Sequence, residues 1–308
     1  MSAVRGFFSG VFCFLLFDVL VLLGIIITVN LTVLNPDFVT DELDKLDVYS
    51  VVIEQAKAQL PGQEFIGSET VDELVTELTP WFEEQADAVI HSLYAYLQGE
   101  QELNVFISLE PVRAAVKESA REAVLASLPP ELQGASQSQI DAFMSQVYTE
   151  IDNVIPATFQ FSETSAGQQV TAQLEQVRKI IGYINTAYKL LIAVAVLLVL
   201  LIALAHWWQP NPIMRSIGIT FILVGVAGIL GSLLDVWLVQ ALSRLVGESS
   251  MLLGLEAKLP ELAADITAPV RMYGIGFLSA GIVLVILSFL FRTPKASHDV
   301  GTGSPVGR

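Results

Sequence analysis

Long apolar runs alternate with polar stretches along this chain, and the apolar runs set its architecture. Four runs are long enough to cross a bilayer as helices, because about 20 mostly apolar residues span the hydrocarbon. They cover about residues 7–29, 187–207, 213–242 and 270–291. Backbone N–H and C=O groups need internal partners in lipid, so each run is predicted to be a helix. The apolar share of 53% over 308 residues favours a membrane protein over a soluble one.

The polar stretch between the first two runs, residues 30–186, is predicted to be a mainly helical domain. Apolar residues recur there at helical spacing, and proline, glycine and capping residues divide the pattern into segments. The predicted helices are 37–58 with a break near Asp47, 71–78 opened by the Thr70 and Glu73 capping box, one from Thr79-Pro80 to about Gly99, 112–128, one capped by Ser138 and Asp141, and one from Ala166 that continues into the second run.

Two short segments of this domain alternate between apolar and other residues, which is typical of strands. They are Leu103–Leu109 and Ala157–Phe161. Because an unpaired strand edge is costly, we expect the two to pair with each other. The predicted fold is an all-α membrane protein with four transmembrane helices, a mainly helical extracytoplasmic domain and a two-stranded β ribbon.

The basic residues predict the orientation, because short loops rich in Lys and Arg stay in the cytoplasm. Arg5 precedes the first run, Arg215 lies between the second and third, and Arg292 and Lys295 follow the fourth. Residues 1–6 and a disordered tail of residues 292–308 are therefore expected in the cytoplasm, with the plasma membrane as location. The domain and an amphipathic loop over 243–268 are expected outside. Three basic residues oppose this orientation: Arg244, Lys258 and Arg271.

Most acidic residues of the chain lie in the predicted external domain. Residues 30–186 hold 25 acidic and 7 basic residues, a net charge of −18. Such a surface is strongly hydrated and repels nucleic acid, and it either attracts cations or a basic partner or reflects a salty habitat. The only cysteine, Cys13, lies inside the first run, so the domain is predicted to be stable without disulfides.

Asp18 is the strongest candidate for a functional residue, because it lies near the middle of the first run. A mid-membrane carboxylate is costly, and such residues usually face the protein interior and are functional. Two interpretations stay open. Asp18 binds a proton or cation, or it forms a hydrogen bond with a Ser or Thr of a neighbouring helix and has only a structural role. Asp235, in the outer half of the third run, is interpreted as a solvated or hydrogen-bonded terminus.

Small residues at four-residue spacing in the last two runs predict close helix packing. They are Ala227, Gly228, Gly231 and Ser232 in the third run, and Gly276 and Ala280 in the fourth. Either the two runs form a tight hairpin or the residues form a seam between copies of the chain.

The segment Asn35-Pro36-Asp37-Phe38, followed by Leu43, Leu46 and Asp47-Val48-Tyr49, resembles a group of uncharacterised prokaryotic membrane proteins. Those proteins are similar in having one span, a helical external domain and several later spans. The resemblance lies mostly in residues 1–100 and implies this architecture without an activity.

The sequence favours a non-enzymatic membrane protein whose acidic domain serves protein binding or envelope assembly at the cell surface, either as a homo-oligomer or with another protein. Its expected partners are membrane lipid and either itself or another membrane or envelope protein, without nucleic acid. The alternative is an ion transport or channel component that uses Asp18. A membrane-anchored enzyme is the third hypothesis. We predict no catalytic residues, cofactor or metal, because three scattered histidines and one cysteine do not build a zinc site.

Overall fold

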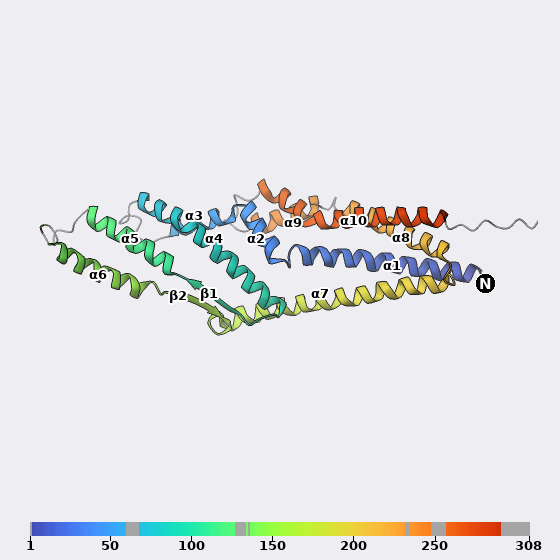
Figure 1. The fold of residues 1–308 in the computed structure, drawn as a ribbon, viewed down its shortest axis with the longest axis horizontal. Helices are drawn as coiled ribbons and strands as arrows, with labels where there is room; N and C mark the ends of the chain where they lie inside the picture. The colour runs from blue at the N-terminus through green and yellow to red at the C-terminus, as the bar shows by residue number, and fades with distance from the viewer. Residues whose placement is uncertain are drawn as a thin grey trace, which may run out of the picture. The chain divides into compact units, whose positions relative to one another are not determined.

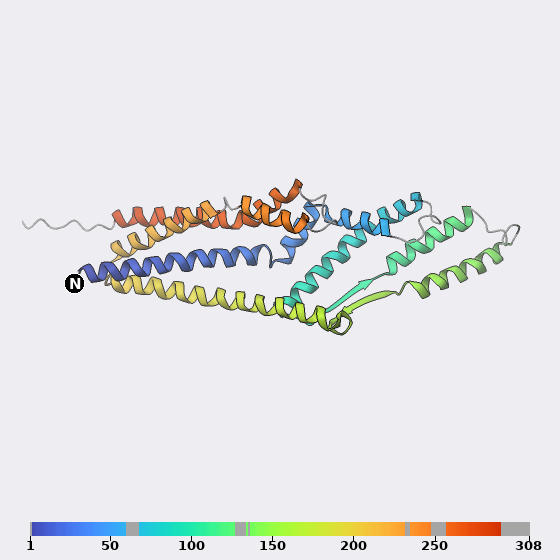
Figure 2. The same ribbon diagram turned by 180° about the vertical axis from the view of Figure 1, so that it is seen from behind.

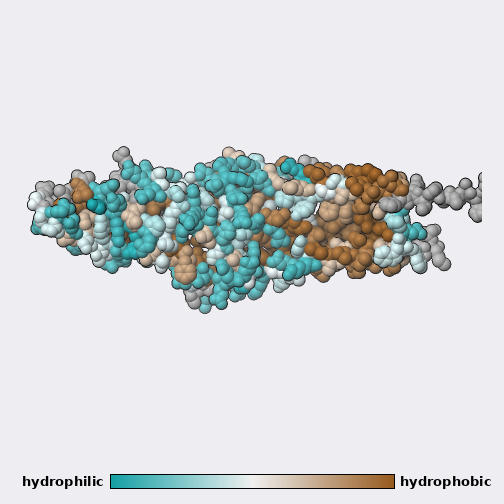
Figure 3. Space-filling view, in the orientation of Figure 1, coloured by the Kyte–Doolittle hydropathy of each residue, from teal (hydrophilic) through white to brown (hydrophobic). Residues whose placement is uncertain are grey.

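The computed structural model describes residues 2–59, 68–126, 134, 136–231, 235–247 and 257–290. Internal contacts divide the chain into two compact units. One, here called the apolar unit, comprises Met1–Ile25, Lys189–Leu233 and Val270–Arg308. The other, here called the ribbon unit, comprises Ile26–Tyr188 and Leu234–Pro269. In Figure 3 the surface of the apolar unit is mostly hydrophobic and that of the ribbon unit mostly hydrophilic.

Helices make up most of the described chain, and two strands complete it (Figures 1 and 2). In chain order the elements are α1 Ser2–Leu31, α2 Pro36–Lys45, α3 Val48–Gln59, α4 Ser68–Gln98, β1 Asn104–Ser108, α5 Glu110–Ala126, α6 Gln137–Val154, β2 Thr158–Ser162, α7 Glu163–Ala205, α8 Pro210–Gly231, α9 Asp235–Gly247 and α10 Leu259–Leu290.

Within the described residues, four helices are long and apolar enough to cross a membrane: Gly6–Leu31, Gly167–Ala205, Pro210–Gly231 and Leu259–Leu290. They match the four predicted runs. The expected helix over 213–242 is covered by α8 as far as Gly231 and by α9 from Asp235, and residues 232–234 lie outside the described residues. The expected outer loop over 243–268 contains the end of α9 and the first turns of α10. Its residues 248–256, and the tail after residue 290, lie outside the described residues.

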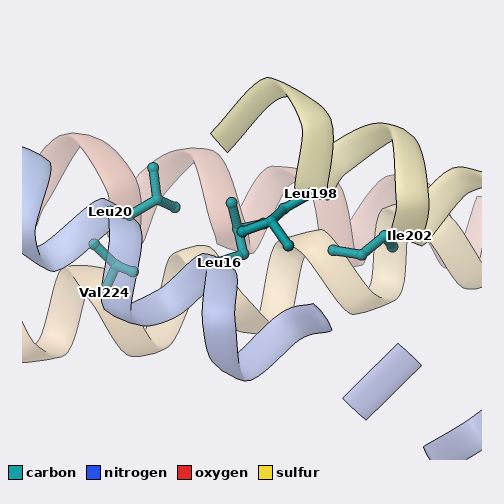
Figure 4. Packing of buried hydrophobic residues seen from close by; sticks show 5 residues of the cluster. All are labelled: Leu16, Leu20, Leu198, Ile202 and Val224. Atoms are coloured by element: carbon teal, nitrogen blue, oxygen red, sulfur yellow. The ribbon is translucent and has the colours of Figure 1, made fainter. Parts of the chain in front are cut away.

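The core of the apolar unit joins three of these helices. Leu16 and Leu20 of α1 meet Leu198 and Ile202 of α7 and Val224 of α8 (Figure 4). Phe221 of α8 packs edge-on against Phe277 of α10, with ring centroids 5.1 Å apart. The packed apolar side chains therefore come from all four long helices.

The ribbon unit is organised by the pairing of β1 with β2, as predicted from the alternating segments. The strands are antiparallel, with Asn104 opposite Ser162 and Ser108 opposite Thr158. Tyr96 and Leu97 of α4, Leu103 and Val105 near β1, and Ile181 of α7 form the buried core beside the ribbon. The connection between the strands is the helix pair α5 and α6, which contact each other.

Local backbone signals confirm two predicted helix ends. The break near Asp47 separates α2 from α3, and Asp47 itself has a φ of 57°. α4 ends at Gln98 and is followed by Gly99, whose φ of 81° favours glycine. There the N–H of Gly99 donates to Tyr96 and that of Glu100 donates to Ala95, which satisfies the last carbonyls of the helix.

Two predicted helix starts are wrong. Pro80 does not open a helix but lies inside α4, where its ring nitrogen leaves one backbone acceptor without its usual donor. Helical residues before and after Pro80 nevertheless form one continuous helix. α6 is capped by Ser136 rather than Ser138, because the Ser136 N–H donates to the Oε1 atom of Gln139 at 2.9 Å.

Candidate functional site

Asp18 lies near the midpoint of the apolar part of α1, which runs from Gly6 to Leu31. The core-facing side of α1 is marked by the buried Leu16 and Leu20. Asp18 is half-buried and lies on another side, where the neighbouring turns carry exposed apolar side chains. These are Phe14, Leu15, Leu22 and Ile25. The structure therefore places the carboxylate on the outward side of α1 and not in the core of the unit.

The environment of Asp18 differs from the expectation that it faces the interior. Among the described residues, no hydrogen bond or ion pair reaches its carboxylate. No Ser or Thr of the described residues bonds it, so the hydrogen-bonded structural role has no support in the described part of the structure. Asp235, in contrast, is hydrogen-bonded, which is one of the two states predicted for it. The Thr267 hydroxyl donates to its Oδ1 atom at 2.6 Å. It is the first residue of α9, where an acid is favourable.

The close approach of α8 and α10 uses glycines, only one of which was predicted. A Cβ atom added to Gly225 would lie 2.5 Å from the Leu278 nitrogen, and one added to Gly228 would lie 2.9 Å from the Gly274 Cα. Gly231 has a looser contact, at 3.7 Å from Val270. Gly276 and Ala280 are exposed and do not face α8, because the glycines of α10 that do so are Gly274 and Gly281. Ser232 lies outside the described residues.

A cavity of about 820 Å³, here called the α1–α8 groove, opens between α1 and α8 in the apolar unit. From α1 it is lined by Gly6, Ser9, Gly10, Cys13, Phe14 and Phe17. A Cβ atom added to Gly6 or Gly10 would meet nothing within 4 Å, so this side of α1 is not covered by the rest of the unit. Ala227, predicted as a helix-packing residue, lines the opposite wall.

A Ser–His contact at one end of this groove was not predicted from the sequence. The Nδ1 atom of His206 is 2.9 Å from the Ile202 carbonyl, which only accepts, so Nδ1 carries a proton. In the neutral ring Nε2 is then an acceptor, and the Ser9 hydroxyl, 3.5 Å away, donates to it. A long contact, with a carbonyl rather than a carboxylate bonded to Nδ1, makes a weak nucleophile, so we interpret this pair as a polar link between α1 and the end of α7.

The ribbon unit carries an apolar cavity of about 570 Å³ between α4 and the ribbon, here called the α4–ribbon groove. Its lining is almost entirely apolar: Trp81, Phe82, Ala86, Val89 and Ile90 from α4, Ile107 and Phe159 from the ribbon, and Leu109, which follows β1, with Gln85 as the polar exception. Phe159 is half exposed at its edge. This apolar groove belongs to the part of the chain with a net charge of −18.

The Lys45 ammonium joins the two segments of the ribbon unit and also pairs with a buried carboxylate. Glu42 of α2 is 4% exposed, and the Lys45 ammonium lies 2.5 Å from its Oε1 atom and 3.0 Å from Asp265 of α10. Burial raises the pKa of Glu42, although Lys45 opposes that effect. The hydrogen bonds to Glu42 and Asp265 raise the pKa of Lys45. Lys258 adds a second link, because its ammonium donates to the Lys45 carbonyl at 3.0 Å.

Two further contacts connect helices of the ribbon unit. His91 of α4 faces acceptors with both ring nitrogens, the Asp37 carboxylate at 3.0 Å and the Asp87 carbonyl at 2.8 Å. These bonds need both ring protons, and the one to Asp37 is the main reason why the pKa of His91 is raised. Asp152 of α6 pairs with Lys117 and Arg113 of α5, which lowers the pKa of its carboxyl group.

No three His, Cys, Asp or Glu side chains cluster with metal-binding geometry in the described part of the chain. Comparison with protein-family models, curated proteins and solved structures finds no match to this sequence. The candidate sites are thus the Asp18 side of α1, the α1–α8 groove and the α4–ribbon groove.

Proposed function

We propose that this chain is a non-enzymatic, multi-pass membrane protein that binds a protein partner outside the cytoplasm through its ribbon unit. The observation that carries this proposal is the α4–ribbon groove. An open cavity lined by Trp81, Phe82 and Ile90 leaves apolar surface in water, and such surfaces mark binding sites. The groove fits an apolar segment of a partner.

The charge of the ribbon unit favours a basic partner over a second copy. Residues 30–186 carry a net charge of −18, so two copies facing each other through this unit repel. A partner whose apolar anchor is flanked by Lys and Arg fills the groove and also gains long-range attraction. This attraction weakens with salt, because the Debye length is about 8 Å at physiological ionic strength.

The membrane arrangement in this proposal has two supports. The basic residues Arg5, Arg215, Arg292 and Lys295 precede, separate and follow the apolar helices in the way that places both termini in the cytoplasm. The ribbon unit also combines the segment after α1 with the segment Leu234–Pro269, which contains α9 and the first turns of α10. In a chain of four spans, these two segments emerge on the same side, and the contact of Lys45 with Asp265 requires that they do.

The test places a photo-crosslinking residue, p-benzoylphenylalanine, at Phe159 in the full chain in its own membrane. We expect a discrete adduct that is lost when Ala86→Glu puts a charge into the groove. The matched control position is Val154 on α6, which is 71% exposed and does not line the groove. An adduct from Val154 that equals the one from Phe159, or one that survives Ala86→Glu, would contradict binding through the groove.

A further inference from the structure

The outward side of α1 presents a carboxylate in the middle of an apolar helix, and its position limits what can solvate it. The Asp18 face is defined by Phe14, Asp18, Leu22 and Ile25, which recur at helical spacing along α1. Asp18 follows Gly6 by twelve residues, or about 18 Å at 1.5 Å per residue. In a hydrocarbon layer of about 30 Å this position is near the centre.

The described part of the chain does not satisfy this carboxylate. Within the described residues it has no hydrogen bond and no ion pair, although it is only half-buried and Phe14 and Leu22, one turn away on either side, are exposed. Asp has a short side chain and cannot extend from this depth to the headgroups as Lys or Arg does near a helix end. A partner for this carboxylate is therefore sought outside the described part of the chain.

We propose that the Asp18 face binds a transmembrane helix of another protein that carries a Lys or Arg near its midpoint. The inference rests on the proposed insertion of the four apolar helices in a membrane. Charge complementarity selects the partner, because intramembrane ions are paired with one another. A second copy does not supply the cation: Lys189, Arg215 and Arg271 each lie near one end of an apolar run, and none lies at its centre.

The α1–α8 groove lies beside this face and gives the partner helix room to pack. Phe14 belongs to both, since it lines the groove and lies one turn from Asp18. Gly6 and Gly10 line the same groove four residues apart, and space above them is open. Small residues at this spacing allow two helix backbones to approach closely. A helix lying along Phe14 thus contacts the groove on one side and Asp18 on the other.

The test uses the full chain in phosphatidylcholine vesicles with a donor dye on a C-terminal tag. The probes are acceptor-labelled Leu/Ala transmembrane peptides with one central Lys, Leu or Asp. Energy transfer at increasing peptide density is expected to show that the Lys peptide binds about tenfold or more tightly than the Leu peptide. Asp18→Asn should remove this preference. Asp18→Lys should transfer it to the Asp peptide, which a merely structural role would not do.

The control variant moves the carboxylate to an exposed position of α7, Asp18→Leu with Leu197→Asp. Loss of the Lys preference in this variant supports the Asp18 face, and retention overturns it. Equal binding of the Lys and Leu peptides by the wild-type chain overturns the proposal. So does self-association of the wild-type chain that Asp18→Leu removes, because a second copy would then cover the face.

Failure of this inference and failure of the membrane proposal give different results. Alkaline extraction followed by flotation of the vesicles reports insertion before any peptide is added. A chain that does not float contradicts the proposed membrane insertion, whereas a floating chain without Lys preference contradicts only the Asp18 inference.

Discussion

At the scale of single residues, Glu42 is a buried carboxylate whose surroundings affect stability. Its carboxylate is buried beside Lys45, and Lys45 links α2 to Asp265 of α10. Lys45→Met is expected to cost about 1–3 kcal/mol, because it leaves a buried charge without its donor. Hydrogen exchange of the α2 amides in the full chain in detergent measures this loss as faster exchange.

The pH dependence of this loss follows from the state of Glu42. Its pKa is already raised by burial, and removal of Lys45 raises it further. A raised folded-state pKa means that the group stabilises the fold below its unfolded value of about 4.5 and loses this contribution as the pH rises through the folded pKa. The defect of Lys45→Met should therefore be largest at neutral pH and shrink toward pH 4.5. Lys179→Met, which removes an exposed pair with Glu175, is the control and should change little.

Residue-level patterns in the sequence predicted which positions are unusual but not which way they face. The depth of Asp18 follows from counting along an apolar run, whereas its outward direction depends on which side of α1 the other helices cover. The same limit explains the glycines. Gly228 and Gly276 have equivalent sequence neighbourhoods of small residues, yet only Gly228 meets the backbone of a neighbouring helix. Spacing identifies candidate contacts, and only the rotation of each helix selects among them.

At the scale of elements, the α8–α10 contact depends on the absence of side chains at its centre. A Cβ atom at Gly225 would lie 2.7 Å from the Gly274 oxygen, so Gly225→Ala must separate the two backbones. We expect a loss of about 1–3 kcal/mol, the usual range for overpacking. Reversible unfolding of the full chain by sodium dodecyl sulfate in mixed micelles, followed by circular dichroism, measures this change.

Gly276→Ala is the matched control for this prediction, because it makes the same substitution in α10 at a position with open space. It should be neutral or stabilise the chain by up to about 1 kcal/mol, since alanine restricts the unfolded chain more than glycine does. If both variants lose stability equally, glycine content rather than close contact explains the effect, and the packing interpretation is wrong.

Elements with strong local signals were predictable, and those decided by tertiary contacts were not. Alternation of apolar residues identified β1 and β2, and the need of each strand for a partner identified their pairing. For Pro80, by contrast, the local sequence signal gave a wrong prediction. The sequence rule places Pro80 at a helix start, but α4 continues through it, because flanking turns and apolar contacts outweigh the one lost hydrogen bond. The α4–ribbon groove was not predictable either, since its walls come from segments that meet only in the folded unit.

At the scale of the whole molecule, the distribution of charge and the contents of the ribbon unit both bear on topology. The ribbon unit contains residues 26–188 and 234–269. In a four-span arrangement two spans separate these segments, so both segments lie on the same side of the membrane. The basic residues Arg244, Lys258 and Arg271 oppose an outside location. However, the Lys258 ammonium makes a hydrogen bond within the ribbon unit, because it donates to the Lys45 carbonyl. We therefore expect the net charge of −18 on the first segment to lie outside, opposite Arg215.

Cysteine labelling tests this topology directly, because Cys13 is the only cysteine and lies inside the first apolar helix. In a Cys13→Ala background, a membrane-impermeant maleimide should label Ser138→Cys of α6 in intact cells. It should label Gln209→Cys, in the exposed turn between α7 and α8, only after permeabilisation. The reverse pattern would place the ribbon unit in the cytoplasm. Labelling of both sites in intact cells would mean that α7 does not separate two compartments, and the four-span arrangement itself would then be wrong.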